Sequence, residues 1–132
     1  DGARLGLGAE SVAKIEQVRA AGLKSLEILK TAGVRMAYGT DLLGASHGLQ
    51  SEEFLIRAQV QSNLEVLQSA TLIGAGLLNQ VGVIGEIAAG ARADLLLVDG
   101  NPLADLSCLT GQGERIPLVM QGGKLRVNEL RA

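Results

Sequence analysis

A long amphipathic helix that leads into a short strand bounded by glycines is the feature that most constrains this fold. Over residues 9–33 the apolar positions recur at helical spacing, at Val12, Ile15, Val18, Leu26 and Leu29. Gly33 is placed to cap the helix, and Gly22 leaves open a division into two helices. Residues 34–38 then predict a strand. Because this order is typical of a parallel sheet covered by helices, we expect an α/β fold.

Residues 44–51 predict a loop, and two further helices are predicted to begin after it. Ser51 precedes two glutamates and is expected to cap a helix whose apolar side is formed by Phe54, Leu55 and Ala58. Ser62 and Glu65 form a capping box that predicts a second helix. The 1–80 part therefore consists mainly of helices around one predicted strand.

From residue 81 the sequence changes to short apolar segments separated by glycines. Strands are predicted at residues 83–84, 94–98, 116–120 and 124–127. Gly122 and Gly123 stand between the last two segments and predict a two-residue hairpin. We expect residues 81–132 to form a second structural unit packed against the first.

Composition excludes several function classes. Aromatic residues make up 2% of the 132 residues and the net charge is −2, so a nucleic-acid partner or an anionic membrane surface is not expected. No apolar run approaches the length that spans a bilayer. Cys108 is the single cysteine and cannot form an internal disulfide, so the chain fits a reducing compartment or has no need of a bridge. We expect a cytoplasmic protein.

Asp41 is the first candidate for chemistry. It directly follows the predicted strand, at the edge where α/β proteins place catalytic groups. A carboxylate there can ligate a metal or move a proton, and the alternative is that it only caps backbone amides of its loop.

His47 is the second candidate, in a loop flanked by glycine. It is the single histidine, so the chain cannot form a zinc site from several imidazoles by itself. Its position leaves two alternatives open, a side chain facing substrate and an idle surface histidine. A triad of Ser46, His47 and Asp41 is discounted because neighbours in one loop rarely reach triad geometry. No phosphate-binding loop is present.

Several short motifs follow one another in a fixed order along the chain. The motifs are Gly39-Thr40-Asp41, His47-Gly48, Ala70-Thr71, Gly85-Glu86-Ile87, the run from Gly90 to Leu103 that contains Ala93-Asp94-Leu95, and the closing Val119-Met120-Gln121-Gly122-Gly123-Lys124. Their order resembles the C-terminal third of an amidohydrolase-superfamily enzyme. They most resemble the branch of imidazolonepropionase-like and Xaa-Pro-dipeptidase-like hydrolases.

This resemblance implies a fold and a site. Residues 1–80 would supply the last helices and the eighth strand of a metal-bearing (β/α)8 barrel, and residues 81–132 would supply strands of a small composite β-sandwich. Asp41 would be a metal ligand and a catalytic proton shuttle, and His47 would lie near the substrate. The expected cofactor is a divalent metal, with zinc as the expected ion. The substrate would be a small molecule with an amide or cyclic-amide C–N bond, such as a dipeptide, an N-acyl amino acid or an imidazolone-like compound.

The resemblance also implies that this chain is incomplete. The family's His-x-His pair, its later histidines and its bridging lysine would precede Asp1, and the chain begins without methionine. We therefore expect a fragment that is inactive alone. The first alternative is a non-catalytic interaction module, either self-associating or binding another subunit, that buries its exposed apolar faces. A third possibility is that a separate chain supplies the missing strands and histidines.

Overall fold

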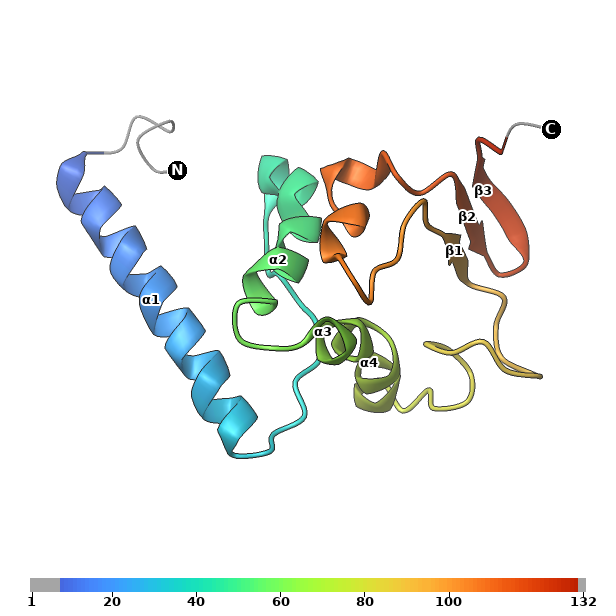
Figure 1. The fold of residues 1–132 in the computed structure, drawn as a ribbon, viewed down its shortest axis with the longest axis horizontal. Coiled ribbons are helices and arrows are strands. Elements are labelled where there is room, and N and C mark those ends of the chain that lie inside the picture. Colours follow the sequence, from blue (N-terminus) through green and yellow to red (C-terminus); the bar gives the residue numbers. More distant parts are fainter. Residues whose placement is uncertain (1–7, 131–132) are drawn as a thin grey trace. The chain divides into compact units, whose positions relative to one another are not determined.

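The computed structural model describes residues 8–130 of the chain (Figure 1). Two compact units divide between Val34 and Arg35. Among residues 8–130, the first unit contains one long helix, and the second contains the other helices and the strands.

Helix α1, Ala9–Thr31, runs through Gly22 without a break, so the alternative of two helices is wrong. The predicted cap is confirmed, because Gly33 has a φ of +69° and its N–H donates to the Lys30 carbonyl at 3.0 Å. The N–H of Val34 donates to the Leu29 carbonyl at 3.0 Å. This pair of bonds is a Schellman motif, which satisfies the last carbonyls of the helix.

The predicted strand at residues 34–38 does not form. The strands of the described part of the chain all lie after residue 94, so this segment has no neighbouring strand to pair with. The N–H of Tyr38 donates instead to the carbonyl of Ser69, at 2.9 Å. A strand exists through its ladder partners, and the barrel is therefore not formed in this chain.

Residues 44–51 are helical rather than a loop. The 3₁₀ helix η2, Gly44–Glu52, leads directly into α2, Glu53–Arg57. The prediction that Ser51 caps α2 is wrong, because the cap position is Glu52 and it makes no side-chain cap bond. The backbone is already helical there, and the Glu53 N–H donates to the Ser51 carbonyl.

The capping box is confirmed at the start of α3, Asn63–Ala70. The Ser62 N–H donates to Glu65 Oε2 at 2.6 Å, and the Glu65 N–H donates to Ser62 Oγ at 3.3 Å. At Thr71 the backbone leaves helical geometry, with φ −122° and ψ −92°, and α4, Leu72–Leu77, begins. The two helices are thus separate elements.

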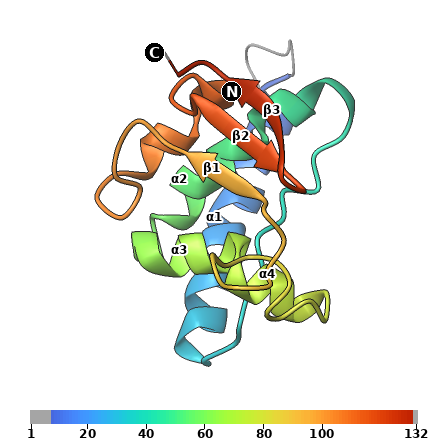
Figure 2. The ribbon, with the colours of Figure 1, turned by 90° about the vertical axis from the view of Figure 1, so that its right-hand side faces the viewer.

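A three-stranded antiparallel sheet contains β1, Leu95–Leu97, β2, Leu118–Gln121, and β3, Lys124–Asn128, in that order (Figure 2). Gly122 and Gly123 have φ of +56° and +76° and form the predicted hairpin turn. The strand predicted at residues 83–84 is wrong. The flanking Gly82 and Gly85 both have positive φ, +77° and +82°, so the chain turns there.

The core of the second unit lies between its helices and the segment that precedes β2. The buried residues of this core are Val66, Leu106, Cys108 and Leu109, with Phe54, Ala58, Leu67 and Val98 packed against them. Leu106–Leu109 form the 3₁₀ helix η3, which Asp105 caps by accepting a bond from the Ser107 N–H at 2.9 Å. Leu55, predicted on the apolar side of α2, is 37% exposed. The core thus joins residues from both sides of position 80.

No helix within residues 8–130 is long and apolar enough to cross a membrane.

Candidate functional site

Asp41 lies at an unusual backbone position. Its φ is +51°, a left-handed conformation that asparagine and aspartate tolerate better than most residues. The side chain is exposed and has no hydrogen bond or ion pair with another described residue. The alternative in which this carboxylate caps backbone amides is therefore not seen. The carboxylate is available to a group from outside the described chain.

His47 lies in η2, and its side chain is exposed. It lines a groove of about 420 Å³ together with Gly48, Gln50, Ser51, Leu109, Gln112, Gly113 and Ile116. The groove therefore lies between η2 and the segment that holds η3 and η4, Gly111–Gly113. Asp41 is not among the residues that line this groove.

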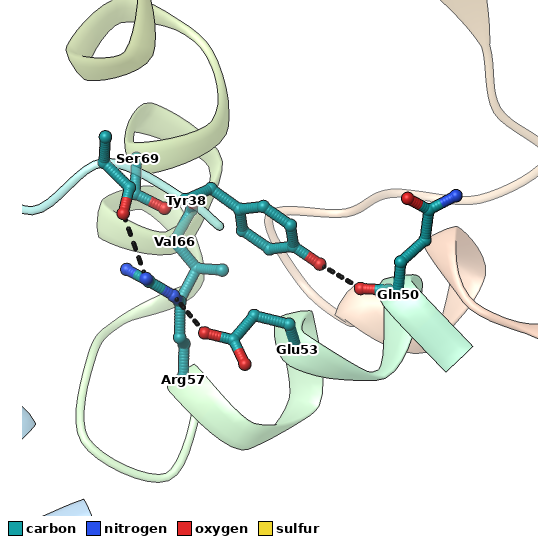
Figure 3. Close-up of polar contacts among 7 residues, drawn as sticks. Tyr38, Gln50, Glu53, Arg57, Val66 and Ser69 are labelled. Carbon is teal, nitrogen blue, oxygen red and sulfur yellow. Dashed lines mark hydrogen bonds and ion pairs between the residues drawn. The ribbon is translucent and has the colours of Figure 1, made fainter. Parts of the chain in front are cut away.

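A buried arginine that the sequence analysis did not single out lies beside the segment before Asp41 (Figure 3). Arg57 is 6% exposed. Its Nε donates to Glu53 Oε1 at 2.8 Å, and its Nη2 donates to the Ala37 carbonyl at 3.0 Å. Its guanidinium also lies 5.5 Å from the ring centre of Tyr38, within cation–π range. Arg57 thus links the end of α2 by a hydrogen bond to the backbone of the segment that precedes Asp41.

Tyr38 is the second member of this cluster. Its hydroxyl donates to the Gln50 carbonyl at 2.6 Å, as Figure 3 shows, and its ring centre lies 4.6 Å from that of Phe54. Burial is the main cause that raises the pKa of Tyr38 to about 12, the negative charge of Glu53 adds to it, and Arg57 opposes it. The hydroxyl therefore remains a hydrogen-bond donor throughout the neutral range.

One sequence signal could have indicated part of this cluster. Glu53 and Arg57 have the i,i+4 spacing of a helical ion pair. Their contacts with Ala37 and Tyr38 depend on the tertiary fold and have no such local signal. Arg57 Nη1 is buried without a hydrogen-bond partner among the described atoms, so the cluster holds one donor that its own residues do not satisfy. Gln61 Oε1, four residues further along the chain, is also buried without such a partner.

The described residues do not hold a metal ion by themselves. Residues 8–130 contain no group of three or more His, Cys, Asp or Glu side chains arranged to bind one. Asp41 fits the role of a single ligand, because its carboxylate is exposed and unpaired. Any further ligands of such a site would come from outside residues 8–130.

Comparison with known proteins identifies the family. The model of the amidohydrolase family matches residues 2–125. A prolidase solved with N-methylphosphonate-L-proline is 49% identical, with a TM-score of 0.85 over 96% of this chain and 31% of its own. A Xaa-Pro dipeptidase solved with methionine in the active site is 32% identical, with a TM-score of 0.73 over 80% of this chain and 25% of its own.

A curated relative gives the same result from sequence. Ochratoxinase of Aspergillus niger is 28% identical over 121 residues, which are 91% of this chain and 25% of that protein. Its crystal structure matches with a TM-score of 0.72. The chain thus spans 25% to 31% of the length of these relatives. It belongs to the amidohydrolase family.

Proposed function

We propose that this chain is the C-terminal part of a metal-dependent amidohydrolase that hydrolyses the amide bond of a dipeptide, with Xaa-Pro dipeptides as the first substrate class. The observation that carries the proposal is the 49% identity, at a TM-score of 0.85, to a prolidase with a phosphonate-proline bound. N-acyl amino acids are the second substrate class. The imidazolone-like class has no support among the relatives compared above.

In this proposal Asp41 is both metal ligand and catalytic residue. A bound divalent metal, with zinc proposed, supplies a Lewis acid and lowers the pKa of water. The carboxylate of Asp41 accepts the proton that water gives up and passes it to the leaving nitrogen. Its exposure, its lack of a described partner and its position directly after the anchored Tyr38 segment support this role.

His47 is proposed to contact the substrate. It is exposed, it lines the groove between η2 and the segment that holds η3 and η4, and it follows Asp41 by six residues. We further propose that residues 1–80 belong to the barrel of the complete protein and residues 81–132 to its sandwich, with the three-stranded sheet as the part of the sandwich already formed.

A hybrid protein tests the proposal. The hybrid consists of the 49% identical prolidase in which this chain replaces the segment it matches, and its control is the same prolidase with that segment removed. The hybrid is assayed with a Xaa-Pro dipeptide, an N-acyl amino acid and a cyclic amide. We expect metal-dependent hydrolysis of the dipeptide by the hybrid and none by the truncated control. A folded, metal-loaded hybrid that cleaves none of the three substrates would contradict the proposal.

Self-association remains the second candidate function, favoured by exposed apolar side chains. Ile87 is 89% exposed, Val81 75% and Leu77 73%. Surfaces of this kind mark contacts with another protein segment. Size-exclusion chromatography of the isolated 132-residue chain tests this candidate. A dimer or larger species supports it, whereas a monomer contradicts it.

A further inference from the structure

We propose that Tyr38 is a positioning residue, whose hydroxyl closes the segment between Tyr38 and Gln50 that carries Asp41 and His47 and thereby fixes where the Asp41 carboxylate lies. The hydroxyl donates to the Gln50 carbonyl at 2.6 Å, across a sequence separation of 12 residues. Both candidate residues lie inside the segment that this bond closes. The role of Asp41 itself rests on the proposed function above.

Tyr38 is a fixed anchor for this bond. Its backbone N–H donates to the Ser69 carbonyl at 2.9 Å, and its ring packs against Phe54. Arg57 covers the ring and donates to the carbonyl of the preceding Ala37 at 3.0 Å. Tyr38 is therefore held from α2 and α3, while its hydroxyl reaches η2 (Figure 3).

Asp41 depends on this anchor because its own side chain makes no described contact. It lies between Tyr38 and η2, in a left-handed conformation with φ +51°. A non-glycine residue keeps such a conformation when the surrounding structure fixes the backbone on both sides. The Tyr38–Gln50 bond joins those two sides. A loop whose ends are joined has fewer conformations to lose when its ligand binds.

The test is Tyr38→Phe in the hybrid protein. This variant keeps the ring beside Phe54 and Arg57 and removes only the hydroxyl. The matched control is Thr110→Val, which removes another hydroxyl donor, bonded to the Ser107 carbonyl at 2.8 Å. After metal removal, the dissociation constant for added Zn²⁺ is measured for each protein. We expect the affinity of Tyr38→Phe to fall about 10- to 100-fold, as for other residues that orient a metal ligand, and that of Thr110→Val to stay at the parent value.

Parent-like Zn²⁺ affinity in Tyr38→Phe would overturn the proposal. Hydrogen exchange gives the second measurement. Faster exchange confined to the amides of residues 39–49 supports the positioning role, and faster exchange that extends equally through α2 and α3 overturns it. Asp41→Asn separates this proposal from the proposed function. If Asp41→Asn binds Zn²⁺ like the parent, the proposed function fails, and if only Tyr38→Phe does so, the positioning role alone fails.

Discussion

Arg57 Nε lies 2.8 Å from Glu53 Oε1, and the two side chains are only 7% and 20% exposed. The two residues are one helical turn apart on α2, and their ion pair lies in the interior of the second unit. By contrast, the Lys24–Glu27 pair on α1, at 2.9 Å, has side chains that are 70% and 52% exposed. The N–O distances of the two pairs are similar, but the Glu53–Arg57 pair is buried and the Lys24–Glu27 pair is exposed.

Glu53→Ala is expected to destabilise the protein strongly. The substitution leaves the buried guanidinium of Arg57 without its charge partner, a change that typically costs about 3–5 kcal/mol. Glu27→Ala is the matched control and should cost less than about 1 kcal/mol, because its pair is exposed. Denaturant unfolding of the hybrid measures both. Equal losses in the two variants would contradict the buried role of the Glu53–Arg57 pair.

The titration of Tyr38 reports whether its cluster forms. It is the single tyrosine of the chain, so tyrosinate absorbance of the isolated 132-residue protein has one source. We expect a midpoint near pH 12 in the folded chain and near the ordinary value of 10.0 in denaturant. A midpoint near 10.0 in both conditions would show that the cluster does not form.

The same shift has a consequence for stability. The folded-state pKa of Tyr38 lies above its unfolded value, so the neutral hydroxyl stabilises the folded chain fully below pH 10.0. That contribution is lost as the pH rises from 10.0 through about 12. Across this pH window, the midpoint temperature of thermal unfolding should fall less in Tyr38→Phe than in the parent. A parallel decline in both proteins would contradict the assignment.

Gly122 is required by the backbone of the hairpin rather than by space. Its φ is +56°, and a Cβ placed there would meet no atom within 4 Å. Gly122→Val should therefore cost about 1–2 kcal/mol, the cost of a left-handed conformation. Gly122→Asn should cost much less, since asparagine tolerates this conformation and Asn-Gly is the preferred turn pair. Denaturant unfolding of the two variants in the hybrid measures the difference, and equal stability would contradict it.

Local signals in the sequence predicted the elements that depend on few neighbours. The Gly33 cap, the Ser62–Glu65 capping box and the Gly122–Gly123 hairpin are all present, because each is stabilised by atoms a few residues away. Ser51 failed as a cap because the preceding residues were already helical, which no local cap signal shows.

Elements that depend on distant partners could not be predicted in the same way. Residues 34–38 have strand-like composition, but no described strand lies beside them. Asp41 was found as a candidate because it follows this segment. The hydrogen bonds from Tyr38 to Gln50 and from Arg57 to Ala37 were missed because they join residues 12 and 20 positions apart in the sequence. Such contacts follow from packing rather than from periodicity.

The most direct test of the account concerns Asp41 itself. In the hybrid protein, Asp41→Asn removes the proposed ligand charge, and Asp99→Asn is the control, because Asp99 is also exposed and without a described side-chain partner. We measure kcat/KM for a Xaa-Pro dipeptide. The account predicts a loss of about 10²–10⁴-fold for Asp41→Asn, the usual contribution of a positioned acid–base group, and parent-like activity for Asp99→Asn. A folded Asp41→Asn hybrid with parent-like activity would contradict the account.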